Sequence, residues 1–227
     1  LFNARTPQPS WAEYGVKFSG EKGKQIIKLD LSEEKKTTNQ NGNVYQISNG
    51  NYTISINEKN NIIVPLFVDL NLTGDFYYEV VLTGNLVGNG ECTGLVATYE
   101  EKEERNYHLF SLIKNRTYGD YRCYASNTKC MDPIAEVILK TGVCNIKNEY
   151  TTLGIERRGS ELYFYINDQL IYRNDFDADK PINRLAVVAP TLSTINIKEA
   201  ACYNKTELKA GYFAKTIWGT SDGILKM

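Results

Sequence analysis

The chain has 227 residues, enough to bury a sizeable core within one β domain. Its 26 basic and 27 acidic side chains nearly cancel, which argues against a strongly basic nucleic-acid-binding protein. No apolar run approaches the roughly 20 residues of a membrane-spanning helix. We therefore expect neither a nucleic-acid partner nor a transmembrane segment. The chain opens on Leu1 without a signal-like apolar run, which is typical of a mature, processed protein.

The first 43 residues are expected to form an arm and a charged loop ahead of the main domain. Residues 1–10 are polar and contain two prolines, which favours extended chain. Short strands are expected at residues 11–18 and 25–31. Residues 32–43 (SEEKKTTNQNGN) carry no apolar anchor, so we place a domain boundary after them.

A dense run of strands is predicted for residues 44–205. Asn49 and Gly50 are typical of a tight hairpin turn, and the charged residues 100–105 are expected to form a solvated hairpin loop. Strands are predicted at residues 44–47, 52–56, 62–68, 75–82, 94–99, 107–113, 118–124, 134–139, 153–157, 162–166, 170–172, 184–188 and 194–198. Because the later connections leave no room for helical crossovers, the sequence predicts an all-β, antiparallel two-sheet sandwich.

Apolar side chains recur in both terminal arms, the second of which is the tail at residues 206–227. They either fold back on their own domain or lie on a neighbouring molecule. In the second case the head-to-tail contacts would repeat into a filament or surface layer. The candidate assembly residues are Trp11, Tyr14, Phe18, Tyr212, Phe213 and Trp218.

The five cysteines match no zinc-binding spacing. In an oxidising compartment we expect a disulfide between Cys123 and Cys130, across a short loop, and a second between Cys92 and Cys144. Cys202 is then left as a free or intermolecular thiol. The alternative is that all five are buried, reduced thiols.

Four Asn-x-Thr sequences are acceptors for N-glycosylation, at Asn51, Asn71, Asn115 and Asn204. Each lies at a predicted turn or strand end, where a glycan reaches solvent. Together with the cysteine content, they indicate a secreted protein of the extracellular space or cell surface.

Several segments resemble the concanavalin A-like jelly roll, in the broad group that includes laminin G-like domains. The matching segments are residues 75–79 (DFYYE), 94–96, 106–110, 162–168 and 195–197, so the resemblance covers about residues 44–203. Asp168 stands where such domains usually have the Gly of an Asn-Gly turn, and Asp also tolerates positive φ. The resemblance implies a jelly-roll sandwich but not one family, since this fold serves lectins, glycoside hydrolases and adhesion modules.

Catalytic residues are not evident in the sequence. Jelly-roll hydrolases usually present paired carboxylates on one strand as Glu-x-Asp-x-x-Glu, and this chain has no such run. Glu101, Glu103 and Glu104 alternate with basic residues, which favours a solvated loop. His108 is the only histidine and alternates with apolar residues, which favours a structural, partly buried side chain. We therefore expect a protein that is not an enzyme.

Two groups of residues are candidate ligand sites, one for calcium and one for a glycan. Asp175, Asp177 and Asp179 alternate as calcium ligands do, but the segment lacks the Gly and distal Glu of an EF-hand, and the alternative is a solvated loop that joins two strands. No other cofactor is expected. Tyr163, Tyr165 and Tyr172 share a predicted sheet region and would line a glycan-binding face, or they serve as ordinary sandwich packing.

The sequence thus favours a non-enzymatic secreted glycoprotein, a structural or adhesive subunit that self-associates through its arms. The alternatives are a carbohydrate-binding, lectin-like module and a divergent glycoside hydrolase.

Overall fold

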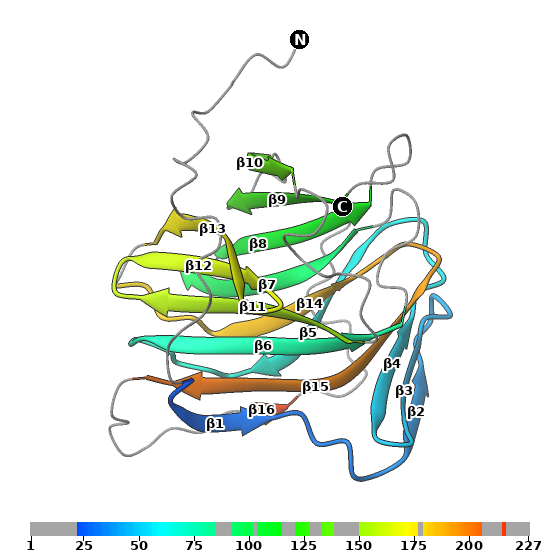
Figure 1. The fold of residues 1–227 in the computed structure, drawn as a ribbon. Helices are drawn as coiled ribbons and strands as arrows, with labels where there is room; N and C mark the ends of the chain where they lie inside the picture. Colours follow the sequence, from blue (N-terminus) through cyan, green and yellow to red (C-terminus); the bar gives the residue numbers. More distant parts are fainter. Residues whose placement is uncertain are drawn as a thin grey trace.

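The computed structural model describes residues 22–84, 92–101, 104–114, 121–127, 133–138, 150–176, 179–205 and 215–216. Within these ranges the chain forms strands and no helix, so it contains no helix that could cross a membrane. The strands lie in two antiparallel sheets that face each other as layers (Figure 1). This arrangement confirms the predicted all-β, jelly-roll sandwich.

The first sheet has nine strands in the order β13-β12-β11-β6-β15-β4-β3-β2, with β1 paired to β15. Its strands are β1 (Lys24–Lys28), β2 (Lys35–Thr38), β3 (Val44–Ser48), β4 (Asn51–Ser55), β6 (Phe76–Thr83), β11 (Tyr150–Arg158), β12 (Glu161–Ile166), β13 (Gln169–Asp175) and β15 (Thr194–Asn204). The second has seven strands in the order β10-β9-β8-β7-β14-β5-β16. They are β5 (Ile62–Val68), β7 (Cys92–Glu101), β8 (Glu104–Lys114), β9 (Tyr121–Asn127), β10 (Pro133–Ile138), β14 (Arg184–Ala189) and β16 (Lys215–Thr216).

The core lies between the two sheets and follows from the period-two alternation of the strands. In β6, Phe76, Tyr78 and Val80 point into this core, whereas Tyr77 and Glu79 lie on the opposite, outer face. β5 differs because all seven of its residues are buried. This explains why its sequence is a continuous apolar run rather than an alternating one.

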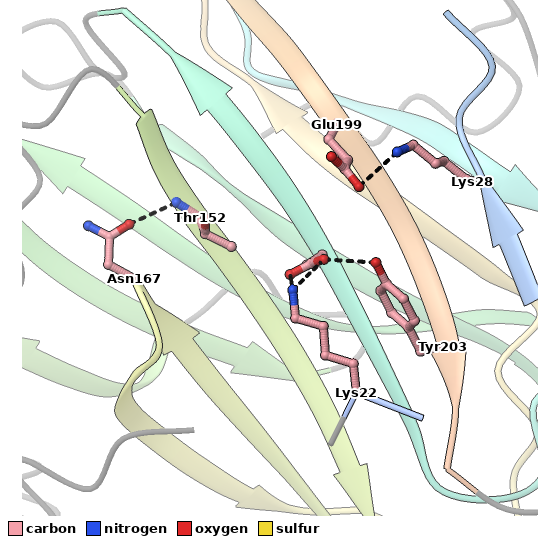
Figure 2. A network of polar contacts seen from close by, with 7 residues as sticks. Lys22, Lys28, Thr152, Asn167, Glu199 and Tyr203 are labelled. Atoms are coloured by element: carbon pink, nitrogen blue, oxygen red, sulfur yellow. Dashed lines mark hydrogen bonds and ion pairs between the residues drawn. The ribbon is translucent and has the colours of Figure 1, made fainter. Parts of the chain in front are cut away.

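Two tight turns were predicted from their residues and are present. Asn49 and Gly50 have φ of 51° and 66°, and Asn167 and Asp168 have φ of 48° and 63°. Paired positive φ values characterise the turns that suit the twist of a β-hairpin. Asp168 therefore takes the left-handed conformation that Gly usually supplies. The Asn167 side chain also accepts a hydrogen bond from the Thr152 backbone N–H at 2.9 Å, which ties this turn to β11 (Figure 2).

The expected domain boundary after residue 43 is wrong, because the sandwich begins earlier in the chain. β1 pairs with β15, and β2 pairs with β3. Between them, Leu29 is buried and donates its backbone N–H to Ala200 O at 2.8 Å. The charged sequence of β2 misled the prediction because β2 ends the strand order of its sheet, and lysines are common on such edges.

The C-terminal tail was predicted either to fold back or to reach a neighbour. Its described part, β16, pairs with β5 of the same chain through Lys215 with Val68 and Thr216 with Phe67. Here the tail adds a strand to its own sheet. The arm residues proposed for assembly, Trp11, Tyr14, Phe18, Tyr212, Phe213 and Trp218, lie outside the described residues.

Candidate functional site

His108 is a core side chain, as its alternation with apolar residues predicts. It is 4% exposed, stacks on Tyr99 with ring centroids 5.8 Å apart, and meets the Phe176 ring at 5.1 Å. Burial lowers its pKa to about 4, so the imidazole is neutral near physiological pH.

Glu101 and Glu104 are paired across the β7–β8 hairpin, and Glu103 lies outside the described residues.

The aspartates considered for calcium are only partly described. Asp175 ends β13 opposite Glu161 and is exposed, and Asp179 is exposed in the following turn. Asp177 lies outside the described residues. In the part of the chain that the structure covers, no group of three or more His, Cys, Asp or Glu could hold a metal ion. A calcium site remains a prediction.

The cysteines are also described unevenly. Cys92 and Cys123 belong to β7 and β9, the two strands that flank β8, but their side chains lie outside the description, as do Cys130 and Cys144. Both disulfides therefore remain predictions. Cys202 is a free thiol buried between the sheets, and burial raises its pKa. An intermolecular bond to Cys202 would require the sandwich to open.

Three of the glycosylation acceptors are described. Asn71 is exposed, whereas Asn51 and Asn204 are half-buried at the ends of β4 and β15. The Asn51 side chain donates a hydrogen bond to the Asn49 carbonyl at 2.9 Å. Asn115 lies outside the described residues. Glycosylation remains a prediction for all four.

The structure brings aromatic and charged side chains together on the outer face of the nine-stranded sheet. Residues directly opposite in a sheet share a face, and two neighbouring rows of such residues run across strands β15, β6, β11, β12 and β13. We call the first the aromatic row; it contains Tyr203, Tyr77, Glu156, Tyr163 and Arg173. The second row contains Ala201, Glu79, Gly154, Tyr165 and Leu170.

Tyr77 is the centre of this cluster, and Gly154 makes its position possible. A Cβ on Gly154 would lie 2.7 Å from the Tyr77 hydroxyl and 3.1 Å from two ring carbons. Glycine thus leaves the space that the ring fills. The Tyr77 ring contacts Tyr165 and Tyr203, each with centroids 6.3 Å apart. Tyr77 and Tyr165 are buried, whereas Tyr163 and Tyr203 stay half-exposed.

Glu79 is a nearly buried carboxylate held by a lysine from the segment before β1. Lys22 Nζ donates to its two oxygens at 2.8 and 2.7 Å, and Tyr203 Oη donates at 3.1 Å. Figure 2 shows the side chains of Lys22 and Tyr203 each joined by dashed lines to one carboxylate that lies between them and the sheet. The Lys22 ammonium also lies over the Tyr77 and Tyr203 rings, 5.8 and 5.7 Å from their centroids.

Glu156 is the second buried carboxylate and comes from the neighbouring strand. Tyr165 Oη and an Arg158 guanidinium nitrogen each donate to it at 2.7 Å, and Lys205 Nζ donates to its other oxygen. Burial alone would raise the pKa of Glu156, but the hydrogen bonds from Arg158, Lys205 and Tyr165 outweigh burial and lower it. The Arg158 guanidinium also lies 4.6 Å from the Tyr163 ring centroid.

Hydrogen-bond donors surround both carboxylates. A glycosidase needs one carboxyl group that is protonated at working pH and a second that attacks or activates water. The lowered pKa of Glu156 and its three donors work against a general acid at that position. Glu79 is enclosed by Lys22 and Tyr203. Carboxylates, tyrosine hydroxyls and basic side chains on one face are also groups able to hydrogen-bond a polar ligand.

The sequence predicted only part of this site. Tyr163 and Tyr165 share a face, as expected, while the Tyr172 side chain lies outside the description. The cross-strand partners were missed, although alternation in Tyr77-x-Glu79 places both on one face of their strand. Alternation carries no information on which strands lie side by side, so the row could not be assembled. The missed residues are Lys22, Tyr77, Glu79, Glu156, Arg158, Tyr203 and Lys205.

No protein-family model and no curated protein sequence matches the chain. Solved structures do match. SCLam, a non-specific endo-beta-1,3(4)-glucanase from family GH16, has a TM-score of 0.57 at 11% identity, over 82% of this chain and 93% of that chain. The CBM2 module of the evolved Dit of Lactobacillus casei BL23 phage J-1 has a TM-score of 0.55 at 11% identity, over 83% of this chain and 99% of that chain. The metal-free Emp46p carbohydrate recognition domain has a TM-score of 0.50 at 10% identity, over 76% of this chain and 88% of that chain. At these identities the comparisons show the fold alone, which is the antiparallel, concanavalin A-like jelly roll that the sequence resemblance implies.

Proposed function

We propose that this protein binds carbohydrate without cleaving it, through the outer face of the nine-stranded sheet. The observation that carries the proposal is the aromatic row with its flanking charges. Tyr163 and Tyr203 are half-exposed, and the Arg158 and Arg173 side chains reach solvent beside them. Sugars combine apolar C–H faces with many hydroxyls, so aromatic rings beside charged hydrogen-bonding groups suit them.

The likeness to solved structures supports this proposal as analogy. The phage CBM2 module and the Emp46p domain carry carbohydrate binding or recognition in their names, and they share the fold of this chain. The glucanase shares it too. We favour binding over hydrolysis because Glu156 is held as an ionised, triply hydrogen-bonded carboxylate. Secretion to the extracellular space or cell surface remains part of the proposal, on the glycosylation sequences and cysteines alone.

Assembly through the terminal arms is not carried forward as the main function. The described part of the tail, Lys215 and Thr216, pairs with its own β5. The residues on which assembly depends lie outside the described ranges.

The proposal is tested by a glycan array followed by titration calorimetry on the best neutral oligosaccharide. Tyr163→Ala should weaken binding about tenfold, equivalent to ~1.4 kcal/mol. Leu192→Ala is the control, because Leu192 is an exposed apolar side chain in the turn before β15. Absence of glycan binding, or equal affinity in both variants, would overturn the proposal. Release of new reducing ends from a bound glucan would replace it with hydrolysis.

A further inference from the structure

An ammonium group is already bound on the proposed glycan face, and it belongs to the protein itself. Lys22 Nζ is held by the two Glu79 oxygens at 2.8 and 2.7 Å. The Tyr77 and Tyr203 rings lie 5.8 and 5.7 Å from it, and Tyr203 Oη donates to the same carboxylate. A carboxylate flanked by aromatic faces is the arrangement by which proteins recognise ammonium ligands. We call Glu79, Tyr77 and Tyr203 the ammonium cage.

The members of this ion pair differ in how they are attached. The Glu79 side chain is 4% exposed, whereas Lys22 is 42% exposed and comes from the segment before β1. The carboxylate and rings are therefore built into the sheet, and the cation covers them from outside. The nearby pair of Lys28 and Glu199 is different, with side chains 47% and 36% exposed. That pair is an ordinary surface salt bridge.

We propose that the ammonium cage recognises the protonated amine of an amino-sugar oligomer, and that Lys22 occupies the cage until such a ligand displaces it. This inference rests on the proposed glycan-binding function and specifies the chemical class of the glycan. Lys22 is then a competing internal ligand. Lys22 lowers the apparent affinity for the ligand, because only the fraction of molecules in which the cage is empty is able to bind it.

The buried carboxylate determines which ligands are able to displace Lys22. Leaving Glu79 ionised and unpaired in a site with little solvent is strongly unfavourable. A neutral sugar or an N-acetylated one offers no positive charge to replace the lysine. A glucosamine oligomer offers an ammonium on every unit. The cage should therefore discriminate against the acetylated sugar, because that ligand would leave a buried charge without a partner.

The test is titration calorimetry on the full chain, in mildly acidic buffer that keeps the sugar amines protonated. A glucosamine oligomer is compared with its N-acetylated counterpart on wild type, Lys22→Met, Glu79→Gln and Lys28→Met. We expect Lys22→Met to bind the glucosamine oligomer about tenfold more tightly. Lys28→Met should resemble wild type, since it removes a lysine from the same sheet face without opening the cage. Glu79→Gln should lose the preference for the free amine.

A second measurement does not depend on a variant that folds. In the wild-type protein, the NMR signal of the Lys22 side chain should shift when saturating glucosamine oligomer releases it from the cage, and the N-acetylated oligomer should leave that signal in place. The inference is overturned if the glucosamine oligomer leaves the Lys22 signal unchanged, or if a folded Lys22→Met variant binds no more tightly than wild type. Neutral glycans that still bind in a Tyr163-dependent manner would show that the proposed function survives this failure. Failure of every glycan to bind would reject both.

Discussion

Replacing His108 with Phe should remove most of the loss of stability on mild acidification. In the folded chain His108 is buried against Tyr99 and Phe176, and burial lowers its pKa from 6.5 to about 4. In the unfolded chain the pKa returns to about 6.5. The unfolded state therefore binds the extra proton between these values. The stabilising contribution is fully present above pH 6.5 and is lost as the pH falls through about 4.

The size of the effect follows from the same two pKa values. At about 1.4 kcal/mol per pH unit, a fall from 6.5 to about 4 corresponds to roughly 3 kcal/mol of unfolding free energy. Urea unfolding followed by circular dichroism, near neutral pH and near pH 4, gives that difference for each protein. Phe keeps an aromatic ring between Tyr99 and Phe176, and carboxylates that titrate in both proteins cancel in the comparison.

The reasoning would be refuted if His108→Phe and wild type lost the same stability between these two pH values. A histidine that titrates near its ordinary pKa would instead be accessible to solvent, and the argument for a purely structural residue would fail. Agreement with the expected difference would establish that the only histidine of the chain is a core side chain.

Further expectations concern the site and the core. Gly154→Ala should lower the unfolding free energy by about 1–3 kcal/mol in urea titrations, because the added methyl group meets Tyr77 at 2.7 Å; an unchanged value would contradict the packing. Tyr165→Phe removes a donor to Glu156 and should cost about 1–3 kcal/mol near neutral pH. Because the pKa of Glu156 is lower in the folded chain than in the unfolded chain, the ionised carboxylate stabilises the fold above its ordinary pKa, and this contribution is lost as the pH falls. The variant, which lacks one donor to Glu156, should therefore lose less stability than wild type on acidification below the ordinary glutamate pKa. Cys202 should react with a thiol reagent only in denaturant, as read by peptide mapping; labelling of the native protein would show that the sandwich opens.

The amino-acid sequence by itself determined most of the strands and the tightest turns. Alternation of apolar and polar residues is a local property, and it decides which face of its own strand each side chain occupies. Asn49 with Gly50 and Asn167 with Asp168 likewise favour positive φ through their own chemistry. Alternation also placed Tyr163 and Tyr165 together.

Only the tertiary structure decided that β1 and β2 belong to the sandwich and which residues come together in the site. β2 has a sequence typical of a charged loop, and its pairing with β3 makes it a strand. Tyr77 lies directly opposite Tyr203 on one side and Glu156 on the other, because β6 pairs with both β15 and β11 in a specific register. A shift of one residue in either pairing would turn these side chains to the other face. That register is set by packing of the whole core between strands distant in sequence, so no local pattern encodes which strands bring the site residues together.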